Sequence, residues 1–343
     1  MRVIDEAHGD GWAFYCGDSV EAIRGLPDAC VGLSLYSPPF ANLYTYSESE
    51  RDMGNCIDDE EFLAHYGFLA GELLRITRPG RLCAVHCKDL VDYRGRDGRS
   101  GLRDFPGDLI RVHERAGWKY HSRIAIWKDP VVEMHRTKAQ GLLYKQLRAD
   151  ATFSRQGLAE YLLVFRRWAD EGDHVAPVTH NIDSFPLQQW QEWASPVWMS
   201  IDQTNVLNVS QARTDRDEKH MCPLQLDLIE RSVRLWSNPG DVVFSPFAGI
   251  GSEGYKALQL DRRFAGIELK PEYWRIGVGN LRAAAAQQTL HLVNARGSAW
   301  TASAGDRSTS AGRILGATCA SVLEDSDDED VRGNAKDITG CDV

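Results

Sequence analysis

The stretch that decides the fold is "DVVFSPFAGIGSEGYKALQLDRRFAGIELK", residues 241–270. An apolar run at 241–247 leads into the spacing Gly249-x-Gly251-x-x-Gly254. An amphipathic segment at 252–260 then precedes a second apolar run at 263–269. Strand, glycine turn, helix and strand in this order form the repeating unit of an α/β sheet. The segment therefore predicts two neighbouring strands with a ligand-binding turn after the first.

The ends of this unit predict a cofactor that carries a ribose. Glycines let the backbone approach a ligand closely, and Glu268, 19 residues after Gly249, can accept hydrogen bonds from ribose hydroxyls. Dinucleotides and S-adenosylmethionine both present such a ribose, so NAD-dependent oxidoreduction is one interpretation of the pattern. The residues expected to contact the cofactor are Phe247, Ala248, Gly249, Gly251, Ser252 and Glu268.

The rest of the chain continues the alternation of short apolar strands with amphipathic helices. Further strands are predicted at 12–17, 31–37, 81–87, 120–127 and 160–165, which gives seven in total. Helices are predicted at 19–25, 59–77, 106–116, 223–237, 252–260 and 271–287. This order is typical of a Rossmann-like α/β fold with helices on both faces of the sheet.

A second motif, "SPPF" at 37–40, follows the apolar run "VGLSLY". Proline cannot donate a backbone hydrogen bond, so the predicted strand must end there. Two consecutive prolines also stiffen the backbone and fix the direction of its carbonyl groups. The motif is either a plain strand exit or a rigid acceptor site for a flat group lying on Phe40.

The composition is that of an ordinary globular protein of 343 residues, with 43% hydrophobic and 26% charged residues. No apolar run reaches the roughly 18 residues needed to span a bilayer, and the acidic N-terminus does not resemble a signal peptide. We therefore expect a cytoplasmic protein. Cys83, His86 and Cys87 come closest to a metal-binding cluster, but a strand over 81–87 favours buried thiols, and we predict no metal.

Charge is unevenly distributed along the chain. The net charge is −10 overall, and residues 324–343 carry −6. Residues 119–168 carry +6, which suits binding of a polyanion. The basic residues expected to contact nucleic-acid phosphates are Arg136, Lys138, Lys145, Arg148 and Arg155.

Taken together, "SPPF" and "SPFAGIGS…GIELKPEYW" resemble the DNA amino-methyltransferases, whose catalytic motif is (Ser/Asp/Asn)-Pro-Pro-(Tyr/Phe/Trp). The catalytic motif comes first and the cofactor loop about 210 residues later, which is similar to the β group of that family. The resemblance covers roughly residues 12–285 and extends to "YCGDSVEAIRGLPDACVGLSLYSPPF" and "KHMCPLQLDLIERSVRLWSNPGDVV". The basic segment resembles phage and prophage members. Ser245 departs from the aspartate that many members have there.

The resemblance implies that S-adenosylmethionine is the cofactor and that an exocyclic amino group of a base in double-stranded DNA is methylated. Catalysis then falls to Ser37, Pro38, Pro39 and Phe40, with Ser37 Oγ and the Pro38 carbonyl as acceptors and Phe40 stacking on a flipped-out base. His220 either holds the cofactor's carboxylate or lies in solvent at the entry of the helix that follows. Asp18 either binds its adenosine or caps the helix that follows.

Serine in the first motif position favours cytosine N4 by resemblance, with adenine N6 as the alternative. The Pro-Cys pair used for ring-carbon methylation is missing, since Cys222-Pro223 has the reverse order. Methylation of RNA or protein, and a non-catalytic DNA-binding relative, are the other interpretations. A cognate restriction endonuclease is a possible partner, and the oligomeric state stays open.

Four regions follow from these motifs. Residues 1–167 form the catalytic half, with a basic insertion at 129–159, and residues 213–290 form the cofactor-binding half. Between them, 168–212 is a tryptophan-containing candidate for target recognition. Residues 291–343 are low in complexity, then acidic, and are expected to be disordered.

Overall fold

The computed structural model describes residues 3–40, 53, 56, 58–137, 144–153, 155–207 and 223–296. The side chains of residues 96, 97, 136, 137 and 288–296 are not among those described. Two predicted site residues, Lys138 and His220, lie outside these ranges, as do residues 208–222 and 297–343. No helix in the described part of the chain is long and apolar enough to cross a membrane.

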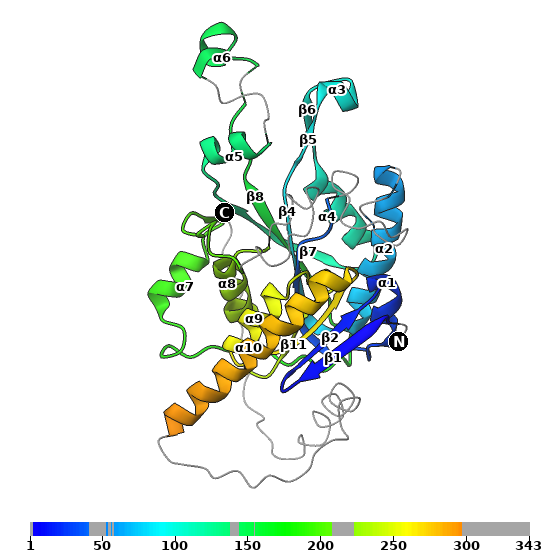
Figure 1. Cartoon of the computed structure of the whole chain (residues 1–343), viewed down its shortest axis with the longest axis vertical. Coiled ribbons are helices and arrows are strands. Elements are labelled where there is room, and N and C mark those ends of the chain that lie inside the picture. Colours follow the sequence, from blue (N-terminus) through cyan, green and yellow to red (C-terminus); the bar gives the residue numbers. More distant parts are fainter. Residues whose placement is uncertain are drawn as a thin grey trace, which may run out of the picture.

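The described residues form a nine-stranded mixed sheet in the order β1-β2-β11-β10-β3-β4-β8-β7-β9 (Figure 1). Its centre is parallel, because β2, β11, β10, β3 and β4 all run in one direction, and β8 runs antiparallel between β4 and β7. The strands are β1 (Asp5–Gly9), β2 (Trp12–Cys16), β3 (Val31–Tyr36), β4 (Thr77–Cys87), β7 (Lys119–Ile126), β8 (Glu160–Arg166), β9 (Val197–Trp198), β10 (Val242–Ser245) and β11 (Arg263–Glu268).

All seven predicted strands are confirmed, and the two outermost strands, β1 and β9, add to them. β1 pairs antiparallel with β2 across a turn at Asp10-Gly11, where Gly11 has φ +74°. Its sequence, "DEAHG", has little apolar character, because an edge strand buries little of its surface. β9 is two residues long and pairs with the end of β7. Neither strand has the alternating pattern from which a strand is predicted.

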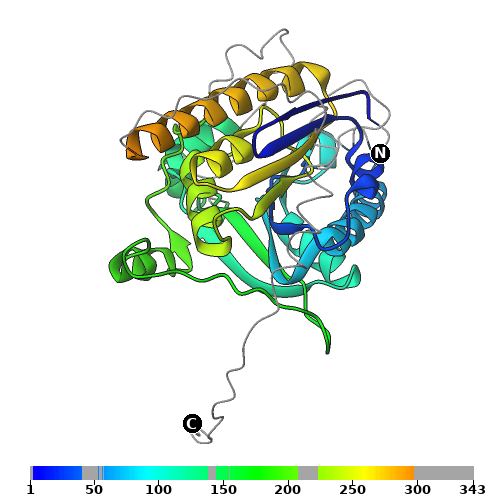
Figure 2. The same cartoon turned by 90° about the horizontal axis from the view of Figure 1, so that it is seen from below.

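Helices cover both faces of the sheet (Figure 2). One face carries α1 (Ser19–Ala22) with its 3₁₀ turn (Ile23–Gly25), α2 (Asp59–Ile76) and α4 (Phe105–Arg115). The other carries α8 (Leu226–Trp236), α9 (Ser252–Gln259) and α10 (Pro271–Arg296). The predicted helices are all present, and α10 continues beyond its predicted end into the first residues of the predicted tail. Asp58 begins α2 by accepting the Glu61 N–H (2.9 Å).

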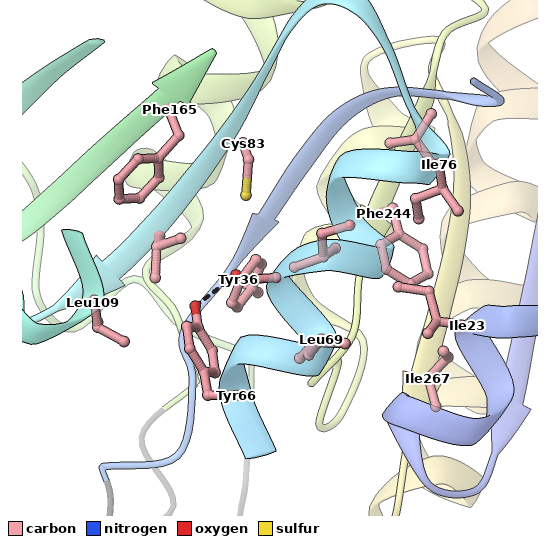
Figure 3. Packing of buried hydrophobic residues seen from close by; sticks show 14 of the residues in the cluster. Ile23, Tyr36, Tyr66, Leu69, Ile76, Cys83, Leu109, Phe165, Phe244 and Ile267 are labelled. Carbon is pink, nitrogen blue, oxygen red and sulfur yellow. Dashed lines mark hydrogen bonds between the residues drawn. The ribbon is translucent and has the colours of Figure 1, made fainter. Parts of the chain in front are cut away.

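The core on the α2 face contains a buried aromatic group around Tyr36 (Figure 3). The hydroxyls of Tyr36 and Tyr66 are 2.7 Å apart, which satisfies two polar atoms that are cut off from water. The His113 ring stacks on Phe165 at 4.0 Å, and burial lowers the pKa of His113 to about 4. The interpretation of Cys83 and Cys87 as buried thiols is confirmed, and burial raises the pKa of Cys83 to about 12.

Two projections extend beyond the sheet on the side where β4 ends (Figure 1). One is the hairpin of β5 (Leu90–Asp92) and β6 (Gly101–Arg103), with α3 (Arg94–Asp97) at its tip. The other contains α5 (Pro130–Thr137) and α6 (Tyr144–Ala149) and corresponds to the predicted basic insertion. The helices described within the predicted insertion therefore project from the sheet and do not add a strand to it.

The tryptophan-containing segment packs against α8. Arg231 lies over the rings of Trp193 (5.4 Å) and Trp198 (5.5 Å), both of which are buried. Trp193 belongs to α7 (Leu187–Trp193). Trp168 and Trp190 are exposed. Two of the four tryptophans between 168 and 212 thus form a small core with an arginine, as is common for a cation over an aromatic face.

Candidate active site

The two predicted motifs meet at one edge of the sheet. Because β2, β11, β10 and β3 are neighbouring parallel strands, their carboxyl ends bring together Asp18, Glu268, the glycine loop after β10 and the motif at 37–40. The ring of Tyr36, directly before Ser37, lies 5.9 Å from the ring of Phe247 in the glycine loop. Residues about 210 positions apart in sequence therefore share one site.

The glycine loop is shaped by its backbone angles and by Glu268. Gly249 (φ +53°) and Gly251 (φ +81°) adopt conformations that other residues rarely take, and no atom lies within 4 Å of where a Gly249 Cβ would stand. Position 254 requires glycine because of space and not because of its backbone angles. A Cβ at Gly254 would meet Leu281 and Phe264 at 2.5 Å. The loop thus leaves an open surface at Gly249, beside the start of α9.

Glu268 ties this loop to the next strand. Its Oε2 accepts the Gly249 N–H and its Oε1 accepts the Lys270 N–H, both at 2.8 Å. An ionised carboxylate oxygen can accept more than one hydrogen bond. The structure brings Glu268, Gly249 and Ala248 together as the sequence predicts, with the Ala248 N–H donating to Ile267 O (2.9 Å).

Asp18 caps the first helix. Its Oδ1 accepts the backbone N–H groups of Val20 (2.8 Å) and Glu21 (3.4 Å). The hydroxyl of Ser19 donates to the carbonyl of Pro246, which fastens this helix start to the glycine loop. Asp18 therefore lies at the predicted edge, and its side-chain hydrogen bonds are those of the helix cap.

The "SPPF" motif leaves the end of β3 with Pro38 buried and the other three residues partly exposed. Ser37 Oγ donates to the main-chain carbonyl of His86 (3.2 Å) and lies 3.4 Å from His86 Nδ1. Phe40 meets Phe105 of α4 edge to face, with ring centres 6.3 Å apart. The motif is thus held between β4 and α4.

The structure describes the side chains of three of the predicted phosphate contacts. Lys145 and Arg148 are exposed on the projecting helix α6. Arg155 is half-buried, where burial lowers its pKa and Glu133, Tyr93 and Asp89 oppose that effect. The side chain of Arg136, at the end of α5, lies outside the described residues, as does Lys138.

Three side chains near Ser37 are absent from the predicted site residues: His86, Glu160 and Lys128. His86 Nε2 lies 3.0 Å from Glu160 Oε2, and Lys128 Nζ lies 2.7 Å from the same oxygen. The sequence predicts the strands, but it does not predict the antiparallel pairing of β8 with β4 that joins His86 to Glu160. Their shared signal is a polar residue two positions away from a buried apolar residue of the same strand, at the edge of the sheet where Ser37 lies.

Glu253, in the first turn of α9, is a fully buried carboxyl next to the loop. Burial, with a smaller contribution from the charge of Glu268, raises the pKa of Glu253 to about 8 from its ordinary 4.5. The folded state therefore keeps a proton that the unfolded chain releases, so this group's stabilisation is lost as pH rises from about 4.5 to 8.

We expect Glu253→Gln, which stays neutral, to remove that loss. The variant should be more stable than wild type at about pH 8.5, with a smaller difference at about pH 5. Thermal unfolding at both pH values measures this. Glu272→Gln, at an exposed position of α10, is the control, and equal changes at the two pH values would contradict the prediction.

Comparison with known proteins agrees with this geometry. A family model of N6/N4-type DNA methylases matches residues 31–278. The Type II methyltransferase M.Cfr9I of Citrobacter freundii is 40% identical over 296 residues, covering 80% of this chain and 88% of its own length. M.BglII of Bacillus subtilis, also a Type II methyltransferase, is 23% identical over 261 residues, which cover 76% of this chain and 66% of its own length.

Solved structures share the fold. The DNA modification methylase TTHA0409 of Thermus thermophilus, complexed with S-adenosylmethionine, superposes with a TM-score of 0.56 at 23% identity, covering 79% of this chain and 94% of its own. The cytosine-N4-specific PvuII DNA methyltransferase gives 0.57 at 16% identity, covering 83% and 93%. The family match spans both motifs and the strands from β3 to β11, so this chain belongs to the N6/N4 family of DNA amino-methyltransferases and uses S-adenosylmethionine.

Proposed function

We propose that this enzyme methylates the N4 amino group of cytosine in double-stranded DNA, with Ser37 and Pro38 as acceptors for the amino hydrogens. The observation that carries the proposal is the contact between Tyr36 and Phe247, which sets the acceptor motif beside the glycine loop. Methylation of adenine N6 by the same arrangement is the alternative.

The residues at the glycine loop fit S-adenosylmethionine. Gly249 offers open space at a positive φ angle, and Glu268 beside it has acceptor capacity for ribose hydroxyls. The buried hydroxyl of Ser245, at the end of β10, has no hydrogen-bond partner in the described part of the chain. We assign the adenosine side to Asp18, Phe247, Ala248, Gly249, Gly251, Ser252 and Glu268, and the carboxylate to His220. The bound cofactor supplies a methyl group on a positively charged sulfur.

Ser37 and Pro38 act on the nucleophile. An exocyclic amino nitrogen is a weak nucleophile because its lone pair is delocalised into the ring. Two fixed acceptors, Ser37 Oγ and the Pro38 carbonyl, draw its hydrogens out of the ring plane and localise the lone pair as the methyl group arrives. Pro39 keeps the turn rigid, and Phe40 provides a face for the base. The base reaches this site by leaving the duplex.

Cytosine is favoured because Ser37 occupies the first motif position, where by resemblance serine accompanies cytosine and aspartate or asparagine accompanies adenine, and the neutrality of its hydroxyl adds a modest physical reason. A hydroxyl is a weaker acceptor than a carboxylate, and the motif offers no other side-chain acceptor to the amino group. The test is mass spectrometry of nucleosides from unmethylated duplex DNA treated with the enzyme, with untreated DNA as the control. We expect N4-methylcytosine. Finding N6-methyladenine without N4-methylcytosine would show that adenine is the target base. The proposed acceptor roles of Ser37 and Pro38 would still hold.

The cofactor assignment predicts the effect of Glu268→Ala. Losing this acceptor leaves ribose donors unpaired at a cost of about 1–3 kcal/mol, so S-adenosylmethionine should bind about tenfold or more weakly. Isothermal calorimetry measures this, with Glu272→Ala at an exposed position of α10 as the matched control. Unchanged affinity in Glu268→Ala would contradict the assignment.

Phosphate contacts predict a change in salt dependence. We assign them to Arg136, Lys138, Lys145, Arg148 and Arg155, and expect Lys145→Ala and Arg148→Ala each to reduce the slope of log K against log salt concentration by about one unit. Lys119→Ala is the control, because Lys119 is exposed at the amino end of β7, the opposite edge from the active site. Equal slopes in all three variants would show that α6 does not contact the DNA phosphates.

The remaining regions keep their proposed roles. We assign target recognition to residues 168–212, of which 168–207 are described and expose Trp168 and Trp190. The catalytic half of the sheet comes from residues 1–167, and the cofactor-binding half comes from residues 213–290. Since similar proteins are Type II methyltransferases, a cognate restriction endonuclease is the proposed partner.

A further inference from the structure

Four polar side chains form a row on one face of the sheet, starting at Ser37. Ser37 Oγ is 3.4 Å from His86 Nδ1, His86 Nε2 is 3.0 Å from Glu160 Oε2, and Lys128 Nζ is 2.7 Å from that oxygen. The side chains of His86, Glu160 and Lys128 are 9%, 12% and 2% exposed. The row therefore connects the acceptor hydroxyl to charged groups that are shielded from water.

The alternation of the strands explains the row. Leu33 and Leu35, Ala84, Leu162 and Val164, and Ile124 and Ile126 all lie in the core beneath α8 and α9. Since side chains on one face of a strand recur every second residue, the next positions on that face are Ser37, His86, Glu160 and Lys128. Each strand thus ends its apolar row with one polar residue at the same edge.

The charge of Glu160 determines which ring nitrogen of His86 carries the hydrogen. Burial by itself would raise the pKa of Glu160, but hydrogen bonds from His86 and Lys128, with the charge of Lys128, hold it below its usual range. The ionised carboxylate therefore accepts from His86 Nε2–H. In the neutral ring this leaves the lone pair on Nδ1, the nitrogen that faces Ser37.

Ser37 needs this neighbour for its proposed role. A hydroxyl that accepts a hydrogen bond from the base must donate its own hydrogen elsewhere. His86 offers two acceptors for it, its main-chain carbonyl at 3.2 Å and its Nδ1 at 3.4 Å. When the hydroxyl hydrogen points to either acceptor, the oxygen lone pairs are left for the base.

We infer that His86, held by Glu160, is a positioning residue that orients the Ser37 hydroxyl as an acceptor and receives its proton during methyl transfer. This inference rests on the proposed role of Ser37. The amino nitrogen forms its bond to the methyl carbon while the electrons of the broken S–C bond stay on sulfur. The nitrogen, now positively charged, releases one proton to Ser37 Oγ as the Ser37 proton passes to His86 Nδ1. The imidazolium is stabilised by Glu160 and then loses that proton to solvent.

A double-mutant cycle tests the inference. Single-turnover transfer from radiolabelled S-adenosylmethionine to unmethylated plasmid DNA is measured for wild type, Ser37→Ala, His86→Asn and the double variant. We expect His86→Asn to slow transfer about 10²-fold, with the affinities for cofactor and DNA within about twofold of wild type. The double variant should be no slower than Ser37→Ala, because His86 acts through Ser37.

His86→Gln is the second variant, since it keeps a donor for Glu160 if His86→Asn does not fold. His121→Asn, at an exposed position of β7, is the matched control and should keep the wild-type rate. Losses that multiply in the double variant, or a wild-type rate in a folded His86 variant, would overturn the relay. A wild-type rate in Ser37→Ala would instead contradict the proposed acceptor role of Ser37, on which the inference rests.

Discussion

Ser37→Ala is expected to reduce the single-turnover rate of methyl transfer about 10²-fold while leaving DNA affinity nearly unchanged, because its acceptor matters most in the transition state. A ground-state contact would instead change KM and leave the rate constant alone. The measurement is radiolabel transfer under enzyme excess, together with equilibrium binding of the same DNA.

Ser34→Ala provides the matched control on the same strand. Ser34 is fully buried, and its Oγ has no hydrogen-bond partner among the described residues. Removing a hydroxyl of that kind should be neutral or slightly stabilising and should not alter the rate. If both variants keep the wild-type rate, the acceptor role of Ser37 is wrong. If both lose it, the effect comes from β3 and not from the hydroxyl.

Asp241→Ala is expected to be the most destabilising of these substitutions. Asp241 accepts from Arg78 (2.9 Å) and the Asn238 N–H (2.7 Å), and lies 3.1 Å from Arg81, whose side chain is 3% exposed. Burial lowers the pKa of Arg81, with Asp241 opposing that effect. Removing the carboxylate leaves a buried charge uncompensated, which costs about 3–5 kcal/mol of unfolding free energy.

Urea unfolding followed by circular dichroism measures that loss. Asp108→Asn is the matched control, because Asp108 pairs with Arg111 at 2.6 Å on the exposed side of α4. An exposed pair of this kind contributes about 0–1 kcal/mol. Similar small losses in both variants would show that the arginines find other partners when Asp241 is absent.

Elements with a strong local signal could be predicted from the sequence. The seven strands and the helices have apolar periodicity, and the glycine loop with Glu268 repeats a known strand–turn–helix geometry. Two features lack such apolar periodicity and are not predicted, although the first is only a local hairpin across Asp10-Gly11. One is β1, whose pairing with β2 defines it. The other is the His86–Glu160 pair, which requires the antiparallel register of β4 and β8, 74 residues apart along the chain.

The strand order also determines when the sheet can be completed. β10 and β11 come last in the sequence, yet they lie between β2 and β3, the second and third strands to be synthesised. Until the final third of the chain leaves the ribosome, β2 and β3 each have an open edge at the centre of the future sheet. Such edges promote pairing with other chains, and contacts so distant in sequence form slowly. A nascent or truncated chain that ends before residue 241 is therefore expected to need chaperones, and methylation competence arises in one late step when the cofactor-binding strands insert.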